Sequence, residues 1–124
     1  MSKLSLEISK DFAFDAAHYF EHKEKDHPFS RLHGHSFQGT VTLAGTPAQD
    51  SGMVKDFWEI DAELKKITAQ LDHRLLNEVE GLEHPSLEDI AMWVFEKLDP
   101  VLPGLVSVEI RRPSWGEKAV VKRG

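Results

Sequence analysis

The sequence predicts an α+β domain in which an antiparallel four-stranded sheet carries two helices on one face. Three observations lead to this prediction. Apolar and polar residues alternate in two segments near the start of the chain and in two near its end, as in half-buried strands. Between them lie two segments whose apolar residues recur every three or four positions, the spacing of a helix with one buried face. Strand pairs separated by two helices are typical of α+β domains, so we expect the order ββααββ.

The first strand is expected over residues 4–14, where leucine, isoleucine and phenylalanine occupy one parity and polar residues the other. Continuing the extended path beyond residue 14 places His18 on the apolar side. Residues 19–32 are polar and contain Pro28, which indicates a surface loop. A second strand is expected to follow this loop. One of its faces begins with two histidines and continues with apolar residues: His33, His35, Phe37, Val41 and Leu43.

The first helix is expected to begin after Asp56, because Glu59 three residues later completes a capping-box-like start. One apolar stripe runs along this helix: Phe57, Ile60, Leu64, Ile67 and Leu71. A second helix is expected to begin near Ser86 and to end before Pro100, since the residue before a proline disfavours helical backbone. Its expected buried face consists of Leu87, Ile90, Ala91, Val94, Phe95 and Leu98.

The last two strands are expected at residues 106–110 and 118–123, joined by a turn at residues 113–116. Residues 1–124 are expected to form a single domain, since a chain of this length supports one core. A four-stranded sheet has two open edges, which proteins usually cover or pair with another subunit. Oligomerisation by sheet extension is therefore expected.

Composition narrows the functional classes. The formal net charge is -6, which argues against a nucleic-acid partner, since such proteins usually carry a basic surface. No apolar stretch approaches the roughly 20 residues that span a bilayer, and the first residues lack the apolar block of a signal peptide. We therefore expect a cytoplasmic protein that has no membrane partner and acts on a small molecule. The chain has no cysteine, so zinc would have to be bound by histidine or carboxylate side chains.

Two histidines separated by one residue, His33 and His35, are the first candidate metal ligands. Alternate side chains of a strand lie on one side, about 6 to 7 Å apart, and can bind one ion. His18, at the end of the neighbouring strand, is the best-placed third ligand, and three such ligands with an open fourth position are typical of catalytic zinc. The alternative is that the pair forms ordinary hydrogen bonds to the backbone where a strand begins.

A carboxylate next to a histidine, Asp72 and His73, follows the end of the first predicted helix. The carboxylate can orient the imidazole and tune its pKa, as a general acid or base near neutral pH requires. The alternative interpretation is structural, because a histidine at a helix C-terminus also complements the helix dipole.

Five segments together resemble one protein family. FDAAH at 14–18, LHGHSF at 32–37, GMVKDF at 52–57, LDHRLLN at 71–77 and HPSLEDIAMW at 84–93 stand in its order and at its approximate spacings. This is the family of 6-pyruvoyl-tetrahydropterin synthase and 6-carboxytetrahydropterin synthase, which is built on the tunnelling fold. The match covers nearly the whole chain, and the combination is far more specific than any single segment.

The resemblance implies a zinc ion bound by His18, His33 and His35. It also implies a homohexamer of two stacked trimers, with barrels closed by strand pairing between subunits and active sites at the subunit interfaces. The implied substrate is 7,8-dihydroneopterin triphosphate, and the implied reaction is that of a lyase. In that reaction zinc acts as a Lewis acid while Asp72 and His73 relay protons as triphosphate leaves.

The first departure from the family concerns its catalytic cysteine, which stands four or six residues before the H-G-H segment. Phe29 and His27 occupy these positions here. Phenylalanine cannot exchange a proton, so His27 is the preferred substitute, with Glu24 and Asp26 of the same loop as further candidates. The alternative is that His27 is simply a solvated loop residue.

The second departure concerns the glutamate on the penultimate strand that binds the pterin ring in this family. The ungapped match places Arg111 there, and a guanidinium cannot accept hydrogen bonds from the ring. Glu109 has the same strand parity and would replace the acceptor if the register shifts. If Arg111 faces the pocket instead, it suits a different phosphorylated or carboxylated substrate.

Three functional hypotheses follow from these residues. The first is a zinc-dependent lyase of the tetrahydropterin synthase type that acts on a pterin. The second is a zinc enzyme of the same fold with another phosphorylated or carboxylated substrate. The third is a non-catalytic zinc-binding subunit that retains the scaffold without the chemistry.

Overall fold

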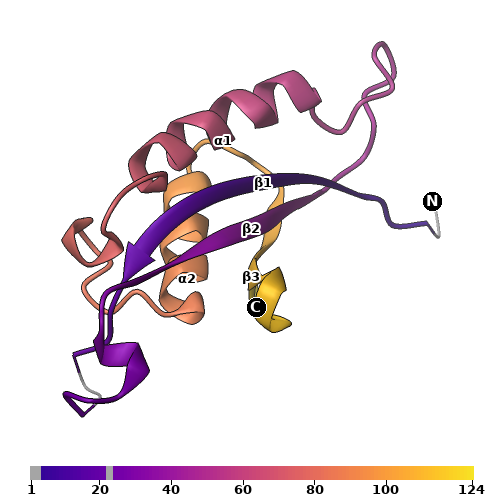
Figure 1. Ribbon diagram of the computed structural model, residues 1–124. Helices are drawn as coiled ribbons and strands as arrows, with labels where there is room; N and C mark the ends of the chain where they lie inside the picture. Colours follow the sequence, from indigo (N-terminus) through magenta and orange to yellow (C-terminus); the bar gives the residue numbers. More distant parts are fainter. Residues whose placement is uncertain (1–3, 22–23) are drawn as a thin grey trace.

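A computed structural model describes residues 4–21 and 24–124. Four strands form one antiparallel sheet in the order β1-β2-β3-β4 (Figure 1). Two helices follow β2 and precede β3 along the chain. The elements are β1 (Glu7–His18), β2 (His33–Ala44), α1 (Phe57–Leu71), α2 (Leu87–Leu98), β3 (Leu105–Arg112) and β4 (Glu117–Lys122). Three short 3-10 helices, Pro28–Ser30, Leu76–Glu78 and Pro113–Trp115, complete the path. The expected ββααββ order and fold class are confirmed.

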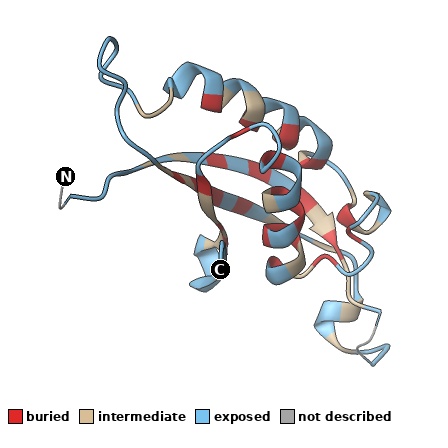
Figure 2. Ribbon diagram, turned by 180° about the vertical axis from the view of Figure 1, so that it is seen from behind, coloured by how far each residue is buried: buried red, intermediate tan, exposed pale blue. Residues whose placement is uncertain are grey.

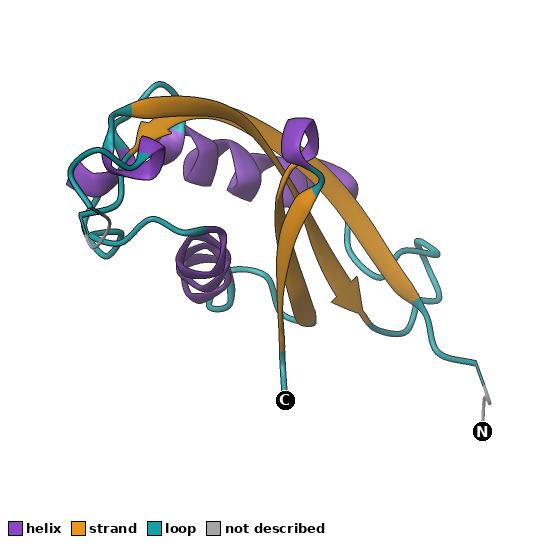
Figure 3. Ribbon diagram, turned by 60° about the horizontal axis from the view of Figure 1, so that its bottom comes forward, coloured by secondary structure: helices purple, strands orange, loops and turns teal. Residues whose placement is uncertain are grey.

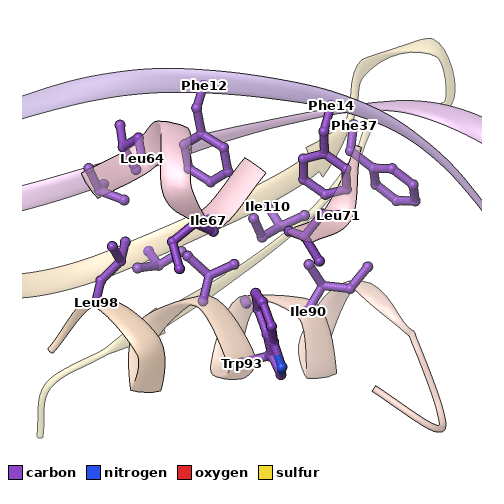
Figure 4. Packing of buried hydrophobic residues seen from close by; sticks show 14 of the residues in the cluster. Phe12, Phe14, Phe37, Leu64, Ile67, Leu71, Ile90, Trp93, Leu98 and Ile110 are labelled. Carbon is purple, nitrogen blue, oxygen red and sulfur yellow. The ribbon is translucent and has the colours of Figure 1, made fainter. Parts of the chain in front are cut away.

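Both helices lie on the same side of the curved sheet (Figure 3). The core fills the space between them: rings of β1 and β2 point toward α1 and α2 in Figure 4. Red buried positions in Figure 2 accordingly recur along the strands and along the inner side of each helix. Within the described residues, no helix covers the opposite face of the sheet, which carries mainly polar side chains, so the sheet presents two chemically different sides.

The first strand lies further along the chain than the expected residues 4–14, and residues 4–6 are not part of it. It begins at Glu7 and continues to His18, because each residue of this segment pairs with β2, from Glu7 opposite Ala44 to His18 opposite His33. The alternation of buried and exposed residues therefore runs unbroken to the end of the strand. This register brings the last residue of β1 beside the first residue of β2.

Helix α1 begins as the sequence predicts, since the Asp56 side chain accepts a hydrogen bond from the backbone N–H of Trp58 at 2.9 Å. The expectation that Phe57 belongs to the buried stripe is wrong: its side chain is 49% exposed, because it lies on the first turn beyond the edge of the core. Trp93, which was not expected in the core, is buried, and its indole N–H donates to the carbonyl of Glu80 at 3.0 Å. Among the described residues, no helix is long and apolar enough to cross a membrane.

Candidate metal centre and active site

Three histidines meet where β1 ends and β2 begins. His18 and His33 are partners in the β1–β2 register, and His35 lies two residues further along the same face of β2. Each side chain offers one ring nitrogen, and these three atoms lie within 4.8 Å of one another. Their rings are 4.6 to 5.0 Å apart between centroids. The structure thus brings together the three residues that the sequence puts forward as metal ligands, which we name the histidine cluster.

Backbone carbonyls fix two of these imidazoles. Nδ1 of His18 lies 2.9 Å from the carbonyl oxygen of Pro85, and Nδ1 of His33 lies 2.7 Å from that of Arg31. A carbonyl only accepts hydrogen bonds, so Nδ1 carries the proton in both rings and Nε2 keeps its lone pair. This carbonyl–histidine arrangement is the usual outer support of metal-binding histidines.

The Nε2 atoms of all three histidines are buried and lack a hydrogen-bond partner within the described residues. Buried polar atoms in folded proteins are almost always satisfied, so three unpaired lone pairs in one place require an absent partner. Three imidazole nitrogens that leave a fourth position open match the donor set of catalytic zinc. The residues therefore fit a zinc ion, bound through the three Nε2 atoms.

Burial favours the neutral form of two of these histidines, His18 and His35. The pKa of His18 is lowered to about 4, mainly by desolvation, although its hydrogen bond to Pro85 acts in the opposite direction. The pKa of His35 is also lowered to about 4, by desolvation first and then by the positive charge of Arg112. Metal binding requires neutral imidazole, so these ligands are ready for an ion at neutral pH.

The segment that follows α1 is held against the outer edge of β1. His73 donates its backbone N–H to the carbonyl of Asp15 at 2.6 Å, and Ala17 donates to the carbonyl of Arg74 at 3.0 Å. The side-chain amide of Asn77 then bonds both backbone groups of Tyr19, at 3.1 and 2.9 Å. The segment therefore fixes the end of the strand that carries His18.

Asp72 and His73 form a hydrogen-bonded pair at this edge. Nδ1 of His73 lies 2.9 Å from Oδ2 of Asp72, while Oδ1 of Asp72 accepts the backbone N–H of Asp15 at 2.8 Å. His73 adopts a left-handed backbone conformation, with φ of 58°, which is uncommon outside glycine. Its side chain is 81% exposed, so Nε2 remains accessible to a ligand.

This pairing shifts the pKa of both side chains, Asp72 and His73. The backbone N–H of Asp15 and then the His73 ring lower the pKa of Asp72. The hydrogen bond to Asp72 and its negative charge raise the pKa of His73, so the imidazolium persists to a higher pH than in an isolated histidine. The pair therefore favours the protonated form of His73.

Substituting Asp72 by asparagine is expected to lower the pKa of His73 toward its ordinary value, because the anionic partner is lost. An NMR titration of the imidazole protons measures this shift directly. Any step that needs protonated His73 is then expected to fail at a lower pH in the variant than in the wild type. An unchanged His73 titration in Asp72→Asn would contradict the pairing.

One cavity of about 580 Å³ connects the two groups of residues. Its lining includes His35 and Gly34 from β2, His73 from the segment after α1, and Asp15 from β1. A ligand in this cavity can contact both a metal-binding imidazole and the Asp72–His73 pair. The arrangement suits proton transfer next to a Lewis acid.

Comparison with known proteins identifies the family. The family model described as 6-pyruvoyl tetrahydropterin synthase matches residues 7–123. The chain belongs to this family. It is 45% identical over 109 residues to 6-carboxy-5,6,7,8-tetrahydropterin synthase of Synechocystis sp., with 83% of each chain covered. It is also 34% identical to dihydroneopterin monophosphate aldolase of Pyrococcus furiosus, with 85% of this chain and 83% of the relative covered.

A solved structure, that of Caenorhabditis elegans 6-pyruvoyl tetrahydropterin synthase, matches with a TM-score of 0.85 and 25% identity. The match covers 98% of this chain and 97% of the other. The relatives named as tetrahydropterin synthases support a synthase-type activity on a pterin. The tunnelling fold of the family is the ββααββ arrangement described above.

The position of the family's cysteine lies in the short 3-10 helix Pro28–Ser30. Phe29 stacks near the ring of His33, with centroids 6.1 Å apart and planes 29° from parallel. His27 caps this helix, since its Nδ1 accepts the backbone N–H of Phe29 at 3.1 Å. Glu24 and Asp26 lie exposed on the loop before it.

Arg111 and Glu109 lie on the helix-free face of the sheet, opposite the histidine cluster. Arg111 Nη1 donates to Oε2 of Glu109 at 3.0 Å and to Oγ1 of Thr40 at 2.8 Å. A further carboxylate, that of Asp11, lies 3.8 Å from Nη2. The structure therefore does not bring these two candidate substrate ligands together with the histidines of the same chain.

Sequence reasoning missed Arg112, the next residue. Arg112 shares the parity of Val108 and Ile110, which are buried on the helix-facing side. Its positive charge contributes to the lowered pKa of both His18 and His35. The alternation of buried and outward-facing residues along β3 could have distinguished the two arginines, since only Arg112 has the parity of the buried Val108 and Ile110.

Proposed function

We propose that the protein is a zinc-dependent lyase that acts on 7,8-dihydroneopterin triphosphate. The observation that carries this proposal is the set of three buried Nε2 atoms without partners, beside a cavity that also reaches His73. The family and the synthase names of the relatives support the pterin substrate. Zinc, bound by His18, His33 and His35, would polarise the hydroxyl oxygens of the substrate side chain.

The protein residues supply binding and proton transfer. Asp72 holds the His73 ring through Nδ1, which leaves Nε2 as the atom that exchanges a proton with the substrate. The backbone contacts between His73 and Asp15 fix the position of this ring relative to β1. The hydrophobic rings of Phe20 and Phe29 lie beside the histidine cluster, with centroids 4.9 Å from His18 and 6.1 Å from His33 respectively.

A second candidate is aldol cleavage of a phosphorylated dihydroneopterin. Phe29 at the cysteine position favours it, because the chain lacks the thiol that the synthase reaction uses there. The name of the relative from Pyrococcus furiosus points to the same chemistry. In this reaction a carbon–carbon bond of the side chain breaks, and the phosphate stays on the small aldehyde fragment.

The fate of the phosphate distinguishes the two reactions. Zinc-loaded protein is incubated with 7,8-dihydroneopterin triphosphate, and the products are separated and identified by mass spectrometry. The synthase reaction is expected to release free inorganic triphosphate, whereas aldol cleavage yields a phosphorylated aldehyde and a hydroxymethyl pterin. If neither product forms, the chain is a zinc-binding protein without this activity.

His27 is proposed as the group that replaces the missing cysteine, because its imidazole is half-buried next to Phe29, and imidazole is a side chain that can exchange a proton. His27→Ala is expected to lower the turnover rate on the order of 10²-fold or more. His27→Asn serves as a control, since its amide still accepts the hydrogen bond from Phe29 but exchanges no proton. Equal activity of the wild type and both variants would remove His27 from the mechanism.

We further propose a homohexamer closed by strand pairing. The helix-free face of the sheet is polar and β4, an outer strand, ends the sheet without covering. Unpaired strand edges favour extension into a neighbouring subunit. Light scattering is expected to report a particle about six times the chain mass of 14.1 kDa; a stable monomer at micromolar concentration would exclude this assembly.

A further inference from the structure

The described residues contain four buried side-chain nitrogens without a hydrogen-bond partner. Three are the Nε2 atoms of the histidine cluster, and the fourth is Nε of Arg112. A zinc ion accounts for the first three. It cannot account for the fourth, because a guanidinium is a cation that only donates hydrogen bonds.

Arg112 lies next to the histidine cluster. The last pair between β2 and β3 is Gln38 with Arg111, and Arg112 is the next residue, with the parity of the buried Val108 and Ile110. Its charge acts on both His18 and His35. The ring of Phe37 is 5.5 Å from that of His35 and 5.7 Å from that of His18. Arg112 therefore extends the helix-facing side of the sheet to the edge of the metal centre.

Only part of the guanidinium is used within the chain. Nη2 of Arg112 lies 2.8 Å from Oε1 of Glu117, its register partner on β4. The Arg112 side chain is 14% exposed, whereas that of Glu117 is 50% exposed. A buried guanidinium with a free N–H is costly, because the lost hydration is only partly replaced.

We propose that Arg112 is a specificity-determining residue that binds the phosphate of the substrate held at the histidine cluster. The inference deepens the proposed function and rests on it. Phosphate is the anionic group of dihydroneopterin phosphates, since the pterin ring itself is neutral. A guanidinium donates planar, charge-assisted hydrogen bonds to phosphate oxygens, and Nε of Arg112 is a buried donor that has no partner within the described residues.

The test compares two ligands that differ only in the phosphate. Zinc-loaded protein is titrated calorimetrically with neopterin monophosphate and with neopterin, both oxidised analogues of the substrate. The wild type is expected to bind the phosphorylated analogue more tightly. In Arg112→Gln this preference is expected to fall on the order of 10- to 100-fold, while the affinity for neopterin stays nearly unchanged.

Lys118→Gln is the matched control. It removes one positive charge from the same hairpin, but Lys118 pairs with Arg111 and is exposed, one position out of phase with the Arg112–Glu117 pair. The preference for the phosphorylated analogue is expected to survive in this variant. Arg112→Lys keeps the charge without the planar fork and is expected to retain part of the preference, so it decides the question if Arg112→Gln does not fold.

The outcomes separate this inference from the proposed function. Equal affinity of the wild type for both analogues would overturn the role of Arg112 and leave the pterin function in place. An equal loss for both analogues in Arg112→Gln and in Arg112→Lys would likewise overturn it, since the residue would then be structural. If the wild type binds neither analogue, the proposed function and the inference both fail.

Discussion

Replacing both His33 and His35 with alanine is expected to lower the metal content from about one zinc ion per chain to near zero. The variant loses two of the three imidazoles whose ligand nitrogens lie within 4.8 Å of one another, and His18 alone is a weak ligand. Elemental analysis of protein purified without added metal measures this change. Activity is expected to disappear with the metal.

A variant outside the histidine cluster provides the control. His73→Asn also removes an imidazole from the cavity, yet it leaves all three metal ligands in place and is expected to keep its zinc. If the double variant retained the same metal content as the wild type, the assignment of the metal centre would be wrong.

The second large effect is expected at His73. Removing this imidazole is expected to reduce turnover on the order of 10²- to 10⁴-fold, the usual contribution of a positioned acid or base. His73 has a φ of 58°, and asparagine tolerates this left-handed conformation better than alanine. His73→Asn therefore removes the proton-transfer group with the least disturbance of the backbone.

Steady-state kinetics of zinc-loaded wild type and His73→Asn give the ratio of turnover rates. The pH profile adds a second readout, because the limb assigned to His73 should be absent from the variant. A variant with nearly normal turnover would show that the Asp72–His73 pair serves only to anchor the end of α1 to β1.

Much of the metal centre follows from strand parity. His18, His33 and His35 share the parity of buried phenylalanines, and side chains of one parity lie on one face of a strand. The sequence leaves open whether β1 continues to His18 and whether His33 and His35 only form hydrogen bonds to the backbone. The strand β1 continues to His18 because the segment after α1 bonds to its outer edge, a contact between residues far apart in the chain.

The two arginines of β3 show where the sequence interpretation reached its limit. An ungapped comparison with the family pointed to Arg111, but parity places Arg111 with Glu109 on the helix-free face. Arg112 follows Ile110 on the buried side, and its free Nε becomes visible only when hydrogen-bond partners are known. Long-range features of this kind, including the contact of Asp72 with Asp15, depend on tertiary packing.

The burial of individual side chains shows the same limit. Phe57 fits the helical stripe by spacing, yet it lies at the first turn of α1 and is 49% exposed. Trp93 does not fit a simple stripe, but the loop that contains Glu80 and Gly81 folds over it and accepts its N–H. Periodicity identifies the inner side of a helix, whereas the loops decide which flanking positions are also covered.

The most direct test of the proposed function is zinc-dependent turnover of 7,8-dihydroneopterin triphosphate. Protein stripped with a chelator is assayed before and after the addition of one equivalent of zinc, with the products followed by mass. We expect no turnover by the stripped protein and recovery after zinc addition, with loss of that recovery in the His33→Ala, His35→Ala double variant. Full turnover by the stripped protein, or none after zinc is restored, would contradict a zinc-dependent pterin lyase.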